Sequence, residues 1–381
     1  MIKKKIKGVY HFLLITSFVF LYSCNFKHNK SMSLVKSDFG ALPSGQKVCK
    51  YKLSNSLMSV EIINYGGIIT NINFPDSKGQ IKDVVLGFDN IDKYLKGHPY
   101  FGAIIGRYGN RISNGKFKIG NREYQLQKNN GENALHGGIK GFDKVIWSVE
   151  ELNETDYIGL KLSYLSKHME EGYPGNLNVE VTYVLNHDNE LKITYEAITD
   201  STTIINLTQH SYFNLSGESS GDILDHLINI NAGSFLPVDK GLIPTGEIRN
   251  VENTPFDFRE FKKIGKDINL KNNQLNLGLG YDHCWVLNNF GNDIRKTTEV
   301  KSMKSGIKLQ VFTDQPGVQF YTGNFLDGSL KSKTSKTYDK RFGFCLETQH
   351  FPNSPNQSNF PSVILSPGDK YKTETWFKFS N

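Results

Sequence analysis

Cysteine is scarce in this sequence, with four residues in 381. Cys24 lies close to the N-terminus, and the remaining three form an odd set without the spacing of a disulfide framework: Cys49, Cys284 and Cys345. We therefore expect no essential disulfide. Cys284 and Cys345 lie in apolar, strand-like segments, where we expect them to be small buried hydrophobic residues.

Motifs for cofactors and nucleotides are also missing. The chain has no G-x-G-x-x-G after a strand, no P-loop, no H-E-x-x-H and no paired C-x-x-C, and its ten histidines are too scattered for a metal cage. We expect no metal and no cofactor at the site, while a structural divalent cation such as Ca²⁺ stays open. The G-x-S-x-G match at 217–221 lacks the parallel strands and long helices of serine hydrolases, so we expect a polar turn there.

Basic residues form no stripe outside the N-terminus. The formal charge of +7 includes four lysines between residues 3 and 7, which precede an apolar segment from Val9 to Tyr22. That segment is short for a membrane span and is typical of a secretory signal. Without it the charge falls to +3 (7 − 4), and we expect no nucleic-acid partner.

The apolar segment ends in LYSC, which resembles a bacterial lipobox, where Cys24 would become the lipidated N-terminus. The alternative is an ordinary signal peptide with an incidental cysteine. We favour a signal at 1–23, a polar tether at 24–37 and one domain at 38–381. The expected protein is an exported monomer, anchored by lipid to a bacterial membrane, with its domain in the periplasm or at the cell surface.

Helical periodicity is scarce in the domain, with short candidates at 90–97 and 259–268. Elsewhere, strand-like segments alternate with turns rich in Gly, Asn, Asp and Pro about every eight to twelve residues. This spacing predicts an all-β fold, a large antiparallel β-sandwich with few short helices. The Ser/Lys/Thr-rich segment from Gly328 to Tyr338 is expected to be an exposed loop.

The strand-like segment from Ile204 to Leu215 contains a histidine. Apolar residues occupy one face, and the other carries uncharged hydrogen-bonding groups around His210, including Tyr212. A solvent-facing strand would carry charged residues instead. His210 is therefore either a structural histidine, which is the more frequent case, or a group that transfers protons.

Two further segments show the same pattern, with Gln319 in GVQFYTGNF and Glu347 in GFCLETQHF set opposite apolar neighbours. A glutamate within an apolar strand is costly unless it is paired or functional. No Arg or Lys lies nearby on its face, which favours function over a structural ion pair. Partial desolvation would raise the pKa of Glu347 toward the range of a general base.

Other segments offer groups suited to sugar hydroxyls. Arg107, Asn110 and Arg111 in GRYGNRI present planar donors and acceptors, although surface loops often carry such residues. His136 precedes two glycines that permit close approach of a ligand, or else it caps a local turn. Asp282 precedes an apolar strand and either accepts from a hydroxyl or caps the turn.

These segments together resemble the aldose 1-epimerase (galactose mutarotase) family, in the family's order and from about Phe39 to the C-terminus. The resemblance rests on GAIIGRYGNRISNGKF, NNGENALHGGIKGFDKVIW, NLTQHSYFNLSG, GLGYDHCWVLN, PGVQFYTGNF and GFCLETQHFPNSPNQSNFPSVILSPGDKY. Gly109, Gln209 and Cys284 depart from the residues common in the family, which affects the expected substrate preference more than proton transfer.

The resemblance implies a galactose-mutarotase-type β-sandwich that holds a sugar across a concave sheet face. It implies that Glu347 is the catalytic base and His210 the catalytic acid. The residues implied in substrate binding are Asn110, Arg111, His136, Tyr212, Asp282 and Gln319. The implied reaction interconverts the α and β anomers of free aldohexoses such as glucose and galactose.

Three alternatives share parts of this pattern. A sugar-binding protein could use the same face but would not need an acid–base pair. A glycoside hydrolase would need two carboxylates flanking the scissile bond, and Asp282 is the only other candidate. An epimerase for hexose 6-phosphates would need additional basic groups, and the sequence shows no such cluster.

Overall fold

The computed structural model describes residues 1–2, 32–291 and 293–381. The chain separates into two units, Met1–Lys30 and Ser31–Asn381, and the fold below is that of the second. Cys24, nearly all of the expected signal and the tether up to residue 31 lie outside the described residues. The predicted start of the domain at residue 38 is too late, because Ser33 to Ser37 already belong to strand β1. Among the described helices, none has the length and apolarity to cross a bilayer.

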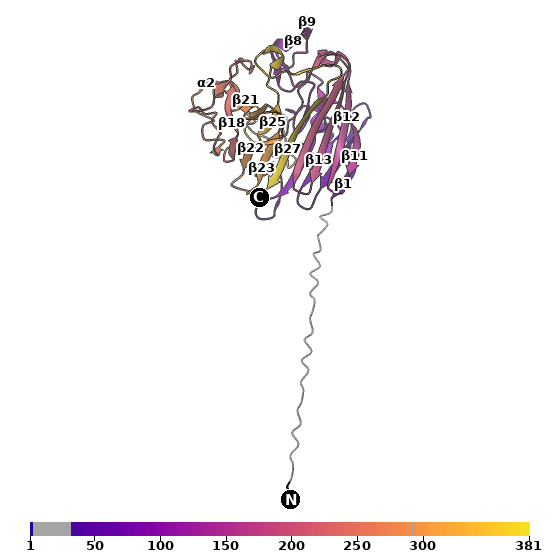
Figure 1. Ribbon diagram of the computed structural model, residues 1–381, viewed down its shortest axis with the longest axis vertical. Helices are drawn as coiled ribbons and strands as arrows, with labels where there is room; N and C mark the ends of the chain where they lie inside the picture. The colour runs from indigo at the N-terminus through magenta and orange to yellow at the C-terminus, as the bar shows by residue number, and fades with distance from the viewer. Residues whose placement is uncertain (3–31, 292) are drawn as a thin grey trace. The chain divides into compact units, whose positions relative to one another are not determined.

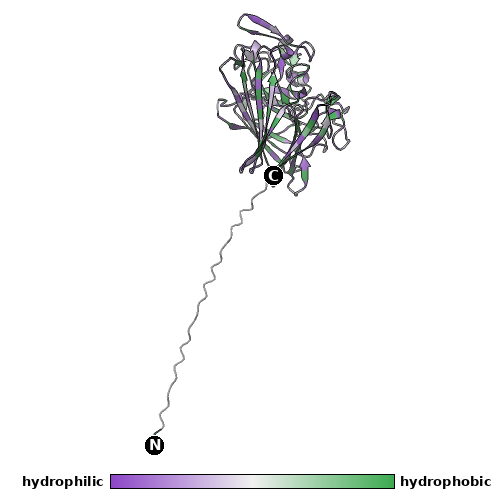
Figure 2. Ribbon diagram, turned by 90° about the vertical axis from the view of Figure 1, so that its right-hand side faces the viewer, coloured by the Kyte–Doolittle hydropathy of each residue, from purple (hydrophilic) through white to green (hydrophobic). Residues whose placement is uncertain are grey.

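A nine-stranded antiparallel sheet dominates the unit and fans out in Figure 1. In its central strands β13 and β14, every second side chain is buried, as a sheet with one solvated face requires. Figure 2 shows the resulting alternation of polar and apolar residues. In sheet order the strands are β11 (Ser148–Asn153), β12 (Tyr157–Ser166), β13 (Leu177–Asn186), β14 (Glu190–Thr199), β27 (Tyr371–Ser380), β23 (Lys308–Thr313), β22 (Arg295–Lys301), β17 (Leu227–Ile230) and β20 (Lys262–Lys263).

Two five-stranded sheets complete the main framework. The first contains β1 (Ser33–Ala41), β2 (Lys47–Ser54), β3 (Ser59–Ile63), β4 (Ile69–Pro75) and β5 (Ile81–Asp83). The second, which we call the site sheet, contains β19 (Arg249–Asn250), β18 (Ala232–Leu236), β21 (Asp282–Leu287), β24 (Gly317–Tyr321) and β25 (Cys345–Gln349). All three sheets contribute apolar side chains to one core, for example Ile62, Ile193 and Phe320. The predicted antiparallel, all-β fold is confirmed.

Short elements connect these sheets. The two-stranded pairs are β6 (Ile104–Ile105) with β16 (Thr208–Gln209), β7 (Arg111–Ile112) with β10 (Ala134–Leu135), β8 (Lys116–Ile119) with β9 (Arg122–Gln125), and β15 (Thr203–Ile204) with β26 (Ile364–Leu365). The helices are α1 (Ile91–Leu95), α2 (Asn273–Gly278), and the 3₁₀ turns η1 (Ser113–Gly115), η2 (Phe142–Lys144), η3 (Glu170–Gly172) and η4 (Ser354–Asn356).

Of the two predicted helices, only the one at 90–97 is confirmed, as α1. The helix predicted at 259–268 is wrong, because Lys262 and Lys263 pair with β17 while Ile264 and Ile268 enter the core. Tertiary pairing overrides the apolar spacing there. The helix that does form nearby, α2, begins where the Asn272 side chain accepts from two backbone N–H groups.

The segment from Gly328 to Tyr338 is not simply the exposed loop that the sequence predicts. Lys333 donates to the carboxylate of Asp83 and to the backbone carbonyls of Thr70 and Val85. The Tyr338 side chain at its end is fully buried. These contacts fix the middle of a polar segment to the first sheet, which its composition did not indicate.

Candidate active site

A cavity of about 830 Å³ opens beside the site sheet. This volume lies within the range of about 300–1,000 Å³ typical of small-molecule sites. Its lining comes from β21, β24 and β25, from the segment around His210, from the segments at 110–114 and 130–136 that contain β7 and β10, and from the loop at 239–243. Seven of the eight predicted site residues line it: Asn110, Arg111, His136, His210, Tyr212, Asp282 and Glu347. Gln319 does not, and it lies next to Glu347 and Asp282.

Strand register brings the site-sheet residues together. Cys284, Gln319 and Glu347 pair across β21, β24 and β25, and Asp282, Tyr321 and Cys345 form the neighbouring row. Paired residues, and residues two apart on a strand, share one face of a sheet. The opposite face of the same strands carries core residues, so the predicted separation of polar and apolar faces is confirmed: Val318, Phe320 and Leu346.

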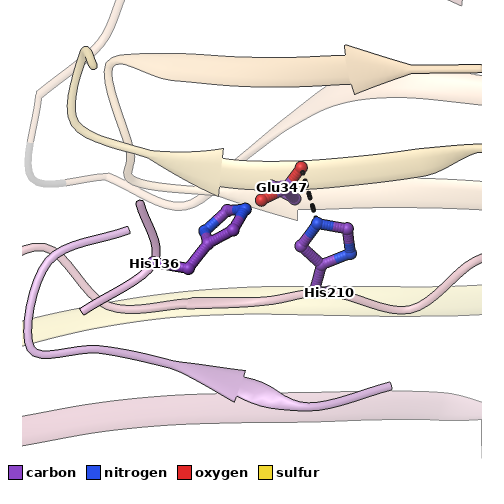
Figure 3. Close-up of side chains that lie close together, drawn as sticks. All are labelled: His136, His210 and Glu347. Atoms are coloured by element: carbon purple, nitrogen blue, oxygen red, sulfur yellow. Dashed lines mark ion pairs between the residues drawn. The ribbon is translucent and has the colours of Figure 1, made fainter. Parts of the chain in front are cut away.

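His210 and Glu347 face each other in the cavity (Figure 3), with His210 Nε2 3.6 Å from Glu347 Oε1. Both side chains are almost completely buried, with exposed fractions of 4% and 2%. The backbone of His210 is held on both sides, because its N–H donates to Ala103 and its carbonyl accepts from Gly102. The pair is therefore preformed.

Aromatic rings enclose the histidine. The Tyr212 ring stacks on His210 with centroids 5.1 Å apart and planes inclined by 25°. Tyr100, which the sequence analysis did not single out, lies 5.8 Å from the His210 ring and packs edge-on against His136 at 4.5 Å. These contacts leave the imidazole little freedom to reorient.

Asn110 and His136 hold each other. The backbone N–H of Asn110 donates to His136 Nδ1 at 3.1 Å, and the backbone N–H of His136 donates to the Asn110 carbonyl at 3.0 Å. Both have left-handed backbone conformations, with φ of 62° and 50°. Because Nδ1 accepts, the neutral imidazole of His136 carries its proton on Nε2 and presents a donor to the cavity.

This tautomer bears on metal binding. One ligand atom each from His136, His210 and Glu347 lies within 4.8 Å of the others, which is close enough for a shared cation. In neutral His136, however, Nδ1 already accepts a hydrogen bond and Nε2 is protonated, so neither nitrogen has a free lone pair. The three residues therefore do not fit a metal centre.

Asp282 and Gln319 form a polar pair beside Glu347. The Gln319 Nε2 donates to Asp282 Oδ1 at 2.7 Å, and Arg111 Nη1 lies 3.9 Å from Asp282 Oδ2. Gln319 Oε1 and Glu347 Oε2 are buried without a hydrogen-bond partner among the described residues. Leaving such groups unpaired costs about 1–3 kcal/mol each, and a ligand rich in hydroxyls would satisfy both.

The electrostatics of the cavity suit proton transfer. Burial and the nearby carboxylate of Asp282 raise the pKa of Glu347 well above its usual range, with the Arg111 guanidinium offsetting part of the effect. Burial lowers the pKa of His210 to about 4, which a hydrogen bond to its own backbone partly offsets. Both shifts favour the uncharged forms, so the proton that the pair exchanges resides on Glu347 and must pass to His210 before Glu347 can act as a base and His210 as an acid.

Comparison with known proteins decides the family. The family model described as aldose 1-epimerase matches residues 50–378. The chain belongs to the aldose 1-epimerase family. The predicted resemblance is confirmed, and with it the expectation of an enzyme that acts on carbohydrates.

Relatives of this epimerase match along nearly their whole length. Galactose mutarotase of Sus scrofa is 48% identical over 350 residues, covering 92% of this chain and 99% of that protein. Galactose mutarotase of Homo sapiens is 47% identical over 349 residues, covering 91% and 99%. The crystal structure of galactose 1-epimerase from Lactobacillus acidophilus NCFM superposes with a TM-score of 0.81 at 28% identity, covering 92% of this chain and 99% of that one.

These relatives correct the predicted localisation. The pig and human proteins are mammalian galactose mutarotases rather than lipid-anchored proteins of a bacterial membrane, so the predicted export to such a membrane is wrong. That prediction rested on the sequence around Cys24, which lies outside both the described residues and the family match.

The sequence motifs did not predict every residue of the site correctly. Arg107 was grouped with Asn110 and Arg111, but its guanidinium turns away and donates to the carbonyls of Pro174 and Gly175. The loop at 239–243 reaches the cavity without any pattern that would have indicated it. Asn130 and Asn133 also line the cavity, and only their place in the asparagine-rich segment before His136 gave a signal.

Proposed function

We propose that the protein interconverts the α and β anomers of free aldohexoses such as glucose and galactose. The buried pair of His210 and Glu347, 3.6 Å apart in a cavity lined by hydrogen-bonding side chains, carries this proposal. The names of the pig and human relatives support the choice of hexose.

The reaction needs one base and one acid. Glu347 removes the proton from the C1 hydroxyl while His210 protonates the ring oxygen, so the C1–ring oxygen bond breaks and an aldehyde forms. Rotation about C1–C2 exposes the other face of the aldehyde. The roles then reverse: Glu347 returns its proton to the carbonyl oxygen, and His210 takes one from the attacking hydroxyl. Each group is expected to contribute on the order of 10²–10⁴-fold.

The other residues hold the sugar still while C1 turns. We assign substrate binding to Asn110, Arg111, His136, Tyr212, Asp282 and Gln319. His136 would donate from Nε2, and the unpaired Gln319 Oε1 would accept from a hydroxyl. Because these contacts fix the rest of the sugar, its C1 hydroxyl and ring oxygen stay oriented toward Glu347 and His210 during the proton transfers.

No cofactor enters this mechanism, since ring opening and closure only move protons and break or form one C–O bond. We also propose that the protein acts as a monomer. Light scattering coupled to size exclusion would test this, and a stable dimer would contradict it.

Polarimetry tests the function directly. The purified protein should accelerate the change in optical rotation of freshly dissolved α-D-glucose or α-D-galactose beyond the rate in buffer. A rate equal to that in buffer, with sugar binding still seen by calorimetry, would instead favour the sugar-binding alternative. Parallel assays on glucose, galactose, xylose and arabinose would rank the substrates.

A further inference from the structure

His210 has a second side-chain partner besides Glu347. Its Nδ1 lies 3.5 Å from the Sγ of Cys345, which is fully buried and precedes Glu347 by two residues on β25. Cys345 pairs with Tyr321 in the row next to Glu347, so strand register places its sulfur on the face of the cavity. Among the described residues, no other side chain comes within hydrogen-bond distance of this nitrogen, which is also the ring nitrogen that can reach the backbone of His210 itself.

We propose that Cys345 is a positioning residue for His210, whose Sγ accepts from Nδ1–H so that Nε2 alone exchanges the proton with the substrate. The proposal rests on the proposed function. A histidine that gives up the proton on Nε2 must keep the other one on Nδ1, because the ring does not lose both. The hydrogen bond that one nitrogen makes decides which proton the other carries.

Sulfur suits this place because it is a weak acceptor. A carboxylate at Nδ1 would stabilise the imidazolium strongly and make it a poor proton donor. A thiol sulfur holds the ring while adding little stabilisation to the charged form. Burial and the nearby carboxylates raise the pKa of Cys345 well above its usual range, so the sulfur stays a neutral thiol beside the His210 ring.

Other groups around the imidazole act on it differently. Glu347 faces Nε2, Tyr100 and Tyr212 cover the ring, His136 packs edge-on against it, and His98 lies further away. None of these reaches Nδ1 within hydrogen-bond distance. Replacing the sulfur therefore changes one contact of His210 and leaves those contacts in place.

The test compares Cys345→Ala, Cys345→Ser and, as a matched control, Cys49→Ala, by polarimetry across pH. Cys49 is a half-buried free thiol on β2, outside the cavity lining, so its removal should leave kcat unchanged. Cys345→Ala should lower kcat roughly 10- to 100-fold with little change in KM, which is the range expected for the loss of a hydrogen bond to a charged group. Cys345→Ser should restore most of kcat.

The pH profile separates positioning from packing. An oxygen acceptor stabilises the imidazolium more than sulfur does, so the pKa of His210 rises in Cys345→Ser, and the limb on which kcat falls with rising pH moves to higher pH. In Cys345→Ala the same limb moves to lower pH. If the descending limb of the kcat–pH profile lies at the wild-type pH in both variants, the proposal is overturned, whatever their kcat. If the alanine variant does not fold, the serine variant decides alone. Absence of activity in the wild type would contradict the proposed function instead.

Discussion

The nine-stranded sheet and the strands β21, β24 and β25 of the site sheet pair in the same antiparallel manner but treat their polar faces differently. In the large sheet, charged residues on the outer face keep contact with water and with each other, as Glu190 does with Lys378 at 3.0 Å. In β24 and β25 every residue is buried, on both faces. A polar side chain on the outer face of the large sheet costs little free energy because water solvates it. A polar side chain buried on β24 or β25 is costly unless it pairs, binds a ligand or takes part in a reaction.

The largest contrast should appear in activity. Glu347→Gln is expected to lower kcat on the order of 10²–10⁴-fold while sugar binding stays measurable, because the amide keeps the shape but cannot take a proton. Glu190→Gln, on the outer face of β14, should retain wild-type kcat. Polarimetry and calorimetry on both variants would check this. Full activity in Glu347→Gln would place the base on another residue.

The next contrast concerns the apolar faces. Phe320 on β24 is fully buried in the core, and Phe320→Ala should destabilise the fold by about 3–5 kcal/mol. Phe312 on β23 lies half-buried on the outer face, and Phe312→Ala should cost clearly less. Urea unfolding followed by tryptophan fluorescence gives both values, and equal losses would show that the outer face is packed as tightly as the core.

The smallest contrast is in stability against pH. Hydrogen bonds from Gln310, Lys301 and Lys296 lower the pKa of Glu299 on β22 to about 2, despite the opposing effect of burial. Its contribution is present above pH about 4.5 and is lost as pH falls toward 2. Glu347 has a raised pKa, so its ionisation costs stability as pH rises above about 4.5.

The two substitutions should therefore have opposite signs at pH 8. Glu299→Gln should destabilise the fold by about 1 kcal/mol, and Glu347→Gln should stabilise it. At pH 4 the effect of Glu347→Gln should disappear. Urea unfolding at the two pH values measures this, and destabilisation by Glu347→Gln at pH 8 would mean that a paired carboxylate is lost.

The sequence predicts the large sheet and the floor of the site for the same reason: a strand alternates with period two. That period identified the faces of Gln319 and Glu347 before any contact was known, whereas the strand predicted around His210 is broken and the histidine directly follows the short β16. It could not indicate Tyr100 or the loop at 239–243, because loops have no period and their approach to the cavity depends on distant pairing. The same limit explains Lys333, whose acceptors lie some 250 residues earlier in the chain.

Mutual support between Asn110 and His136 has a consequence for selectivity. Since each backbone N–H is already bonded to the other residue, neither loses conformational freedom when a sugar arrives, and little entropy is spent on ordering them. Because the His136 side chain is held in place, its Nε2–H cannot reorient toward the hydroxyl of a stereoisomer that points in another direction. The site is thus expected to distinguish stereoisomers at the hydroxyl facing His136 more strictly than at hydroxyls that lack such a fixed donor.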